Sequence, residues 1–455
     1  MKRRDFLRLT GATVGASALA GTALGDQTPP FRTPRASGKS VMGLVTPKMD
    51  VVRVGLIGIG ERGSGHLSHL LALEGVEVRA ICDSHGPTLQ AGQKQFTDKH
   101  LPVPPSYGKD EYDYRNMLDR DDIDLVMVVT PWEKHVSMAV DAMNRGKHVF
   151  TEVPAAVTVE EAWKLVDTAE KTQRHCMMME NCCYGREELL VLNMCRLGLF
   201  GELLHGEGAY IHDLRTQMFQ LDHGCGSWRT AHYTKRNGNL YPTHGLGPVA
   251  QYMSINRGDR FDYLTSMSSP ARMRDIFAKE HFPEDSIRRK SKYVCGDINT
   301  TIVKTALGRT IMVQWDEQLA RPYPRLNLIQ GTKGVWGGYP QRVVIEGTTK
   351  TAEEWTEGEG LETFYDKYEH PLWKRVGDEA KVQGGHGGMD WVMLWRAIYC
   401  LRNGLPLDQS VYDAAAWSVI SPLSEWSVAH RGQSVDVPDF TRGKWKTTEP
   451  LGIVT

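Results

Sequence analysis

The stretch VRVGLIGIGERGSGHLSHL, residues 52–70, decides the fold of the chain. Its first half is a continuous apolar run, which is typical of a β-strand covered on both faces. Gly58, Gly60 and Gly63 follow at the spacing G-x-G-x-x-G, and helix-like sequence continues beyond them. Such a turn between a strand and a helix predicts a dinucleotide site. Gly58 permits the tight bend, Gly60 lets the pyrophosphate approach the backbone, and Gly63 lets helix and strand pack closely.

Strand-like and helix-like segments alternate from this stretch as far as Glu180. Strands are expected over 51–59, 76–83, 123–131 and 148–154. Helices are expected over 65–74, 113–122, 135–145 and 158–173. This alternation predicts a parallel, doubly wound sheet, and therefore an α/β Rossmann domain over residues 51–180.

The pattern changes after Glu180. Longer strands with period-two alternation and glycine-containing turns are expected over 202–214, 261–269, 297–318 and 327–347. Helices return over 387–404 and 410–432. We expect a second, substrate-binding α+β domain over 181–455, built on a large, mainly antiparallel open sheet with C-terminal helices and a tail. Its open face suggests a homo-oligomer.

The N-terminus has the pattern of an export signal. Arg3 and Arg4 precede an apolar stretch of small residues that runs to about Gly25, with an A-x-A site at residues 18–20. This predicts a signal peptide of the twin-arginine (Tat) type over 1–25, export to the periplasm, and a linker over 26–50. The apolar stretch is too short to span a bilayer comfortably, so no integral membrane segment is expected in the mature form.

The composition of the chain limits the classes of ligand and partner that it can bind. The net charge of -1, with both signs mixed, provides no electrostatic footprint for nucleic acid. The 12 Trp and 16 Tyr residues suit either a large core or sugar-stacking surfaces. Eight scattered cysteines without a C-x-x-C pair predict mostly buried thiols, although one disulfide stays open. No metal is expected, because the His and Asp residues between 205 and 232 lack the short spacing of a zinc site.

A bound dinucleotide is expected to contact three further places in the Rossmann domain. Asp83 ends the second expected strand, where a carboxylate binds the ribose hydroxyls and repels a 2′-phosphate. This favours NAD over NADP. The turns at 131–135 and 151–154 end the third and fourth strands, where the nicotinamide half of a dinucleotide lies.

The Rossmann half, a Thr-Pro turn after the third strand and a Glu-x-Pro turn after the fourth resemble the glucose–fructose oxidoreductase/inositol dehydrogenase superfamily. Most oxidoreductases of that group carry Glu-Lys-Pro at the second turn, and the lysine helps to deprotonate the hydroxyl that is oxidised. This chain has Glu152-Val153-Pro154. The missing lysine counts against an ordinary sugar dehydrogenase.

A narrower resemblance covers nearly the whole mature chain. PWEKH at 131–135, NGNLYPTHGLGP at 237–248, GHGGMDW at 385–391 and SPLSEWS at 421–427 resemble glycoside hydrolase family 109, the NAD-dependent α-N-acetylgalactosaminidases. The resemblance implies NAD contacts at Glu61, Arg62, Asp83, Trp132, Glu133, Lys134, His135, Glu152, Val153 and Asn181. It implies substrate contacts at Tyr210, Arg229, Tyr241, Pro242, Thr243, His244 and Tyr323. Glu61 departs from the family, which carries an apolar residue there, but backbone contacts would survive the change.

The same resemblance implies a reaction unlike that of a carboxylate-pair glycosidase. A terminal α-linked N-acetylgalactosamine would be oxidised at C3, eliminated across C1–C2, hydrated and reduced again. The cofactor is restored in every turnover, so it should be tightly bound and recycled. An exported enzyme could therefore carry it without an outside redox partner.

His244 is the first choice for the base, because imidazole titrates near working pH. Tyr184 and Tyr241 are further candidates for acid or base, although a tyrosine base needs a lowered pKa. Glu152 is expected to orient the nicotinamide ribose or to polarise His244. Arg229 and Tyr210 are expected to hold the N-acetyl group or the hydroxyls of the sugar.

Two alternatives stay open. An exported NAD(P)-dependent sugar oxidoreductase of the same superfamily would share the fold and the cofactor, and Val153 argues against it. A non-catalytic sugar-binding protein would need no intact nucleotide site, and the glycine pattern, Asp83 and His244 argue against it.

Overall fold

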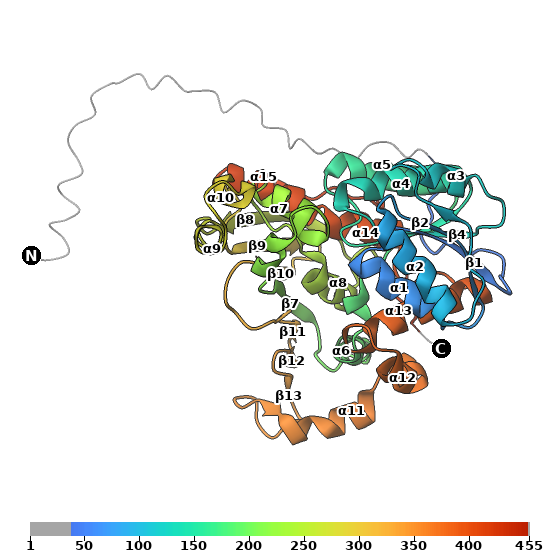
Figure 1. The fold of residues 1–455 in the computed structure, drawn as a ribbon. Helices are drawn as coiled ribbons and strands as arrows, with labels where there is room; N and C mark the ends of the chain where they lie inside the picture. Colours follow the sequence, from blue (N-terminus) through green and yellow to red (C-terminus); the bar gives the residue numbers. More distant parts are fainter. Residues whose placement is uncertain (1–37, 454–455) are drawn as a thin grey trace, which may run out of the picture.

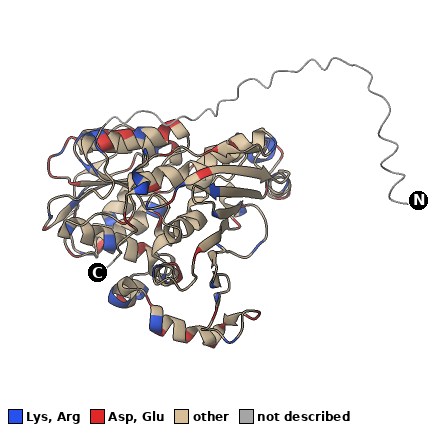
Figure 2. Cartoon of the chain, turned by 180° about the vertical axis from the view of Figure 1, so that it is seen from behind, with Lys and Arg blue, Asp and Glu red and all other residues tan. Residues whose placement is uncertain are grey.

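The computed structural model describes residues 38–453 and forms two sheets with their helices (Figure 1). The expected signal peptide and residues 26–37 of the expected linker lie outside the described residues. Lysine and arginine are interspersed with aspartate and glutamate over the helices and loops (Figure 2). No helix among residues 38–453 is long and apolar enough to cross a membrane.

The N-terminal sheet has six parallel strands in the order β3-β2-β1-β4-β5-β6. The strands are β1 (Val52–Ile57), β2 (Val76–Cys82), β3 (Ser106–Tyr107), β4 (Leu125–Val128), β5 (His148–Thr151) and β6 (Cys176–Met178). The helices are α1 (Glu61–Leu70), α2 (Gly86–Asp98), α3 (Tyr114–Leu118), α4 (Trp132–Asn144) and α5 (Val159–Thr172). Strands β4 and β5 are buried along their whole length, as apolar strands covered on both faces must be.

The C-terminal sheet has nine strands in the order β14-β13-β12-β11-β7-β10-β9-β8-β15. It is mainly antiparallel, and β7 and β10 are its parallel pair. The strands are β7 (Leu203–Ile211), β8 (Phe261–Ser268), β9 (Asn299–Thr305), β10 (Thr310–Asp316), β11 (Leu328–Gly331), β12 (Gly334–Gly337), β13 (Arg342–Ile345), β14 (Thr356–Glu357) and β15 (Val435–Asp436).

Helices pack on one face of this sheet, with α8 on β7 and α15 on β8. The α-helices of this domain are α6 (Arg186–Arg196), α7 (Cys225–Tyr233), α8 (Thr243–Tyr252), α9 (Met273–His281), α10 (Ile287–Lys290), α11 (Glu362–Tyr368), α12 (Pro371–Gln383), α13 (Met389–Asn403), α14 (Val411–Ser418) and α15 (Ile420–Ala429). The 3₁₀ segments are η2 (Asn181–Tyr184), η3 (Arg215–Phe219), η4 (Gly358–Leu361), η5 (His386–Gly388) and η6 (Lys444–Lys446). The other face exposes Tyr263, Met267 and Ile302, and β12, β13 and α11 form an arm that projects from the body (Figure 1).

Two glycines let α8 approach β7 closely. A Cβ atom on Gly208 would lie 2.4 Å from the carbonyl oxygen of Gly245, and a Cβ atom on Gly245 would lie 2.1 Å from the amide of Ala209. Larger residues would push the helix away from the strand. The first turn of α8, with Thr243 and His244, is therefore held against the end of β7.

Residues 38–50, the described part of the expected linker, pack against both domains. Ser40 lies 3.0 Å from the hydroxyl of Tyr412 in α14, and the side chain of Gln173 donates to the carbonyl oxygen of Lys39. The side chain of Val41 is buried. This segment is therefore an ordered part of the folded body.

The predicted fold class is confirmed: a parallel Rossmann-type sheet precedes a mixed, mainly antiparallel sheet. All eight cysteines lie within the described residues, and none forms a disulfide. The first helix begins at Glu61 instead of residue 65, so the last glycine of the G-x-G-x-x-G turn already belongs to the helix.

Candidate active site

The glycine-rich turn joins β1 to α1 and has the three properties that its spacing predicts. Gly58 has a φ of +88°, and a Cβ atom there would lie 2.2 Å from the carbonyl oxygen of Val129. A Cβ atom on Gly63 would lie 2.0 Å from the carbonyl oxygen of Gly58, whereas one on Gly60 would meet no atom of the described residues within 4 Å. The backbone at Gly60 therefore borders open space beside the N-terminus of α1, where a pyrophosphate fits.

Asp83 directly follows β2 and is fixed by two backbone amides. Its Oδ2 accepts a 2.7 Å hydrogen bond from the amide of Ile59, and its Oδ1 accepts a 2.8 Å bond from the amide of His85. The carboxylate is thus tied to the glycine-rich turn, at the place where a ribose is bound in this fold. Since a carboxylate oxygen has two lone pairs, it can accept further hydrogen bonds from ribose hydroxyls.

Arg62 connects the two domains beside this turn. Its Nε donates to Glu152 at 2.8 Å, and its Nη1 and Nη2 donate to Asp390 of α13 at 2.6 and 3.0 Å. Asn181 donates to the same Asp390 at 2.6 Å, and His66 lies 2.6 Å from Glu152. Burial raises the pKa of Glu152, but Arg62 and His66 lower it more, so that the group stays ionised. Three predicted cofactor residues, Arg62, Glu152 and Asn181, therefore belong to one buried network.

The remaining predicted cofactor residues lie at the ends of β4 and β5 and at the start of α1. The side chain of Glu133 reaches His232 of α7 at 3.0 Å, and Lys134 reaches Glu111 at 2.8 Å. His135 lies 2.8 Å from the carbonyl oxygen of Pro154 and 2.7 Å from that of Thr130, so it joins the two turns. Val153 is buried, whereas Glu61 is exposed at the first position of α1.

An aromatic cluster joins the Rossmann domain to the C-terminal domain. Trp132 stacks on Tyr241 with ring centroids 5.6 Å apart, and Tyr241 lies 4.9 Å from Tyr210 and 4.9 Å from His244. Tyr323 packs edge-on against Tyr210 at 6.2 Å. Such rings offer flat apolar faces with polar edges, which is the surface that a sugar ring needs. The structure thus brings four of the predicted substrate residues into one cluster, which Tyr241 joins to the predicted cofactor residue Trp132.

Arg229 lies beneath this cluster. Its guanidinium is 5.0 Å from the Trp132 ring and 5.2 Å from the Tyr241 ring. Burial lowers the pKa of Arg229, but Glu317 at 3.6 Å holds it above its ordinary value. Its Nε is buried and has no hydrogen-bond partner among the described residues. A buried, charged donor without a partner is costly, so this group is suited to an oxygen of a bound ligand.

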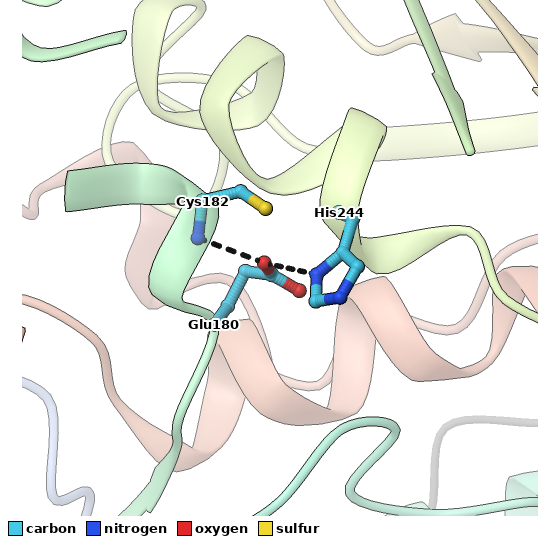
Figure 3. Close-up of side chains that lie close together, drawn as sticks. All are labelled: Glu180, Cys182 and His244. Carbon is cyan, nitrogen blue, oxygen red and sulfur yellow. Dashed lines mark hydrogen bonds and ion pairs between the residues drawn. The ribbon is translucent and has the colours of Figure 1, made fainter. Parts of the chain in front are cut away.

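His244 pairs with a carboxylate that sequence reasoning missed. Its Nδ1 lies 2.6 Å from Oε1 of Glu180, which is fully buried at the end of β6 (Figure 3). Burial raises the pKa of Glu180, but His244 contributes to a net lowering. An ionised carboxylate makes Nδ1 the donor, so that Nε2 of the neutral ring is an acceptor. Among the described residues, Nε2 has no hydrogen-bond partner.

Four predicted residues around the start of α8 and in η2 complete the account of the site. Pro242 precedes α8, and Thr243 is its first, fully buried residue. Burial raises the pKa of Tyr241 well above its ordinary value, which makes its hydroxyl a donor and a poor base. Tyr184 is not brought to the cluster: its buried hydroxyl donates to Asp408 at 3.3 Å, and burial raises its pKa as well.

Of the two roles expected for Glu152, the structure does not show the one in which it polarises His244, and the orientation of the nicotinamide ribose stays a prediction. Glu152 is engaged by Arg62 and His66, and Glu180 takes the place beside His244. The physical reason is topological. Strand β6 lies next to β5 in the sheet, and the chain that leaves it runs directly to the C-terminal domain, whereas the end of β5 faces α1.

One group within the described residues could hold a metal ion. Glu180, Cys182 and His244 each offer one ligand atom, and these atoms lie within 4.8 Å of one another (Figure 3). Carboxylate, thiolate and imidazole are zinc ligands. A metal on Nδ1 would replace the hydrogen bond to Glu180, and burial raises the pKa of Cys182 well above its ordinary value, which opposes thiolate formation.

Comparison with known proteins assigns both halves of the chain. The family model for the C-terminal domain of glycosyl hydrolase 109 matches residues 184–447, and that for the NAD-binding Rossmann fold of an oxidoreductase family matches residues 52–180. A glycosyl hydrolase family 109 protein of Shewanella baltica is 58% identical over 454 residues, which cover 99% of this chain and 98% of the relative. The chain belongs to glycosyl hydrolase family 109. A second family 109 protein, from Shewanella putrefaciens, has the same identity and coverage.

Solved structures support the fold of this family 109 member. A levoglucosan dehydrogenase in complex with NADH and levoglucosan is 20% identical and has a TM-score of 0.63, with 85% of this chain and 99% of that chain covered. An NAD binding oxidoreductase from Klebsiella pneumoniae is 16% identical and has a TM-score of 0.66, with 85% and 99% covered. The architecture is therefore that of an NAD-binding oxidoreductase, carried by an enzyme of a glycoside hydrolase family.

Glu180 and Asp390 are the site residues that sequence reasoning missed. Asp390 lies in the stretch GHGGMDW, and Glu180 directly follows the apolar run 176–179. A carboxylate directly after an apolar strand, as at Asp83, was the available signal for Glu180. Asp390 had no such signal, because only the folded chain brings α13 against α1.

Proposed function

We propose that this family 109 enzyme is an exported, NAD-dependent glycosidase that releases terminal α-linked N-acetylgalactosamine. The observation that carries the proposal is the His244–Glu180 pair: the His244 ring belongs to an aromatic cluster next to the predicted nicotinamide turns. A base at that place suits elimination. The usual pair of carboxylates that flanks an anomeric carbon is not needed for such chemistry.

The glycine-rich turn, Asp83 and the Arg62 network fit NAD by their geometry. Gly60 borders open space, and Asp83 would bind the ribose hydroxyls and repel a 2′-phosphate. Bound NAD+ would supply a hydride acceptor, and later a hydride donor, at C3 of the sugar. Because the cofactor would be restored in each turnover, an enzyme that releases it slowly needs no new supply. The folded protein could then be exported by the twin-arginine route with its cofactor bound.

The chain's own residues would divide the remaining work. Once C3 is a ketone, the proton on C2 is acidic, and Nε2 of His244 would remove it. The Glu180 carboxylate would stabilise the imidazolium that forms. Arg229 would donate from its unpartnered Nε to the N-acetyl or a hydroxyl oxygen. Tyr210 and Tyr323 would line the sugar site through their rings.

The test is turnover of an aryl α-N-acetylgalactosaminide in heavy water. Elimination predicts one deuterium at C2 of the released sugar, because the proton on C2 exchanges with solvent. Direct displacement predicts none. His244→Gln should abolish both turnover and deuterium incorporation while it keeps the bound NAD+. Release of unlabelled sugar at the full rate, or full activity without NAD+, would refute the proposal.

Export is tested separately. Replacement of Arg3 and Arg4 by lysine should leave the protein, with its cofactor, in the cytoplasm of a host bacterium, because the twin-arginine pair is the address that the pathway reads. Cell fractionation with the unaltered chain as the control measures this. Equal periplasmic amounts of both forms would contradict the predicted route.

A further inference from the structure

Two histidines from different domains stack on each other. His85 follows β2 in the Rossmann domain, and His223 lies in the loop between η3 and α7 of the C-terminal domain. Their ring centroids are 4.0 Å apart and their planes differ by 19°. Thr88 links the pair, since its hydroxyl lies 2.6 Å from Nδ1 of His85 and 3.2 Å from Nε2 of His223. The contact thus combines ring stacking with a bridging hydroxyl.

The stacked pair adjoins the predicted ribose site. The backbone amide of His85 donates to Oδ1 of Asp83 at 2.8 Å, while the amide of Ile59 donates to Oδ2 at 2.7 Å. A ribose on this carboxylate would therefore lie between the glycine-rich turn on one side and the residues that lead into the stack on the other. Through its contact with His85, His223 of the C-terminal domain lies beside the adenosine end of the predicted cofactor site.

The loop that presents His223 is anchored at both ends. Buried Arg288 of α10 donates to the carbonyl oxygens of Met218 at 2.9 Å, Gln220 at 2.7 Å and Gly226 at 3.1 Å. The side chain of Gln220 also accepts a 2.7 Å bond from the amide of Gly226. These bonds hold the loop on both sides of His223, so the ring is presented in a fixed place.

We propose that His85, Thr88 and His223 form a clasp that retains NAD at its adenosine end. This rests on the proposed function, because only a cofactor that is recycled in place gains from slow dissociation. For the ribose to leave Asp83, the two rings and the bridging hydroxyl must separate. One stacked pair and one hydrogen bond, at the values common in proteins, together slow that step by about ten- to a hundredfold. The clasp touches no reacting atom and takes no part in the chemistry.

The test measures how fast the holoenzyme releases NAD+. The loaded enzyme is mixed with an excess of the fluorescent etheno-adenine analogue of NAD+, and the exchange is followed by fluorescence. His223→Ala should raise the dissociation rate about ten- to a hundredfold and leave kcat at saturating NAD+ unchanged. His223→Phe keeps a stacking ring without the hydrogen bond and should restore part of the retention. Arg288→Gln should raise the rate less than His223→Ala.

His430→Ala is the matched control. His430 also stacks on an aromatic ring, that of Trp426, at 4.0 Å and 17°, but both residues lie at the C-terminal end of α15 and join no domains. Its removal should leave NAD+ release unchanged. An unaltered release rate in His223→Ala overturns the clasp while turnover by the wild type still stands. A wild type that retains no NAD+ overturns the proposed function and the clasp together.

Discussion

The carboxylate of Glu180 accepts a 2.6 Å hydrogen bond from Nδ1 of His244, and this contact joins the end of β6 to the first turn of α8. It fixes both the orientation and the tautomer of the ring. The other ring nitrogen, Nε2, is then the basic one, on a ring that packs against Tyr210 and Tyr241. The catalytic assignment of His244 therefore depends on a residue from the other side of the domain boundary.

Replacement of the Glu180 carboxylate tests whether His244 needs it to act as a base. In Glu180→Gln the amide group can donate to Nδ1, which places the proton on Nε2 and removes the base. We expect kcat to fall by at least about a hundredfold, as in other histidine–carboxylate pairs, with KM and NAD+ content nearly unchanged. Steady-state kinetics and the cofactor absorbance measure this.

Glu187→Gln makes the same atomic change seven residues later. Glu187 is half-buried and contacts the Tyr365 hydroxyl at 3.4 Å. It should keep kcat within about threefold, as expected for a residue outside the pair. Similar losses in both variants would mean that Glu180 acts only through folding.

The glycine-rich turn offers a second test, because its three glycines meet different surroundings. Gly60→Ala should leave the unfolding free energy of the cofactor-free protein within about 0.5 kcal/mol, since its Cβ atom enters open space. It should weaken NAD+ binding by at least about tenfold, because the methyl group occupies the place of the pyrophosphate. Gly63→Ala should cost about 1–3 kcal/mol in stability. Denaturant unfolding and NAD+ titration measure the two effects.

Gly65→Ala is the control for this series. Gly65 is exposed in the same helix, and its Cβ atom would also meet nothing within 4 Å. We expect a gain of about 1 kcal/mol from helix propensity and unchanged NAD+ affinity. Weaker NAD+ binding in Gly65→Ala than in Gly60→Ala would place the pyrophosphate elsewhere.

Part of the fold could be predicted from the sequence alone. Strands β1, β2, β4 and β5 of the Rossmann domain were predictable because apolar runs covered on both faces end in short polar turns, as at Asp83 and Glu152. The short strands β3 and β6 were not predicted. Helices α6 and α8 were not predicted. They are buried on most sides and lack a clear polar face: Leu189 to Leu192 are all buried in α6, and α8 contains Gly247 and Pro248.

The candidate site was predictable only in part. The residues around Tyr241 and His244 came from a stretch similar to a known family, and the structure places them together. The partners of these residues could not be predicted, since they depend on contacts between elements far apart in the chain. Asp390 lies 328 positions from Arg62 in the sequence and 2.6 Å from it in space, and no local pattern carries that information.

Asp390 provides the third prediction. Its carboxylate accepts hydrogen bonds from Arg62 and Asn181 and lies 2.7 Å from Nδ1 of His386. In Asp390→Ala a largely buried guanidinium loses half of its charge partners. We expect the unfolding free energy to fall by about 3 kcal/mol and NAD+ affinity to fall by at least about tenfold, because two predicted cofactor residues lose their orientation. Thermal unfolding and NAD+ titration measure this.

Asp378→Ala is the control for that variant. Asp378 lies on α12 with a fully exposed side chain, and within residues 38–453 it pairs only with Lys381 at 3.0 Å. Its loss should change neither quantity measurably. An Asp390→Ala protein that binds NAD+ normally would separate this carboxylate from the cofactor site.

The interdomain pair of Glu133 and His232 predicts a pH dependence of stability. His232, whose Nε2 lies 3.0 Å from Oε1 of Glu133, is the largest cause that lowers the pKa of Glu133 from its ordinary 4.5 to about 2. Between these values the unfolded chain binds more protons than the folded one, so the contribution of Glu133 is present above about pH 4.5 and is lost as the pH falls toward 2. The melting temperature of the wild type should exceed that of Glu133→Gln at pH 6, and the difference should shrink through that window. In a His232→Gln background the difference at pH 6 should be smaller, because the main partner is gone while a backbone hydrogen bond and Arg236 still lower the pKa of Glu133. A difference that grows on acidification would show that Glu133 is stabilised in its protonated form instead.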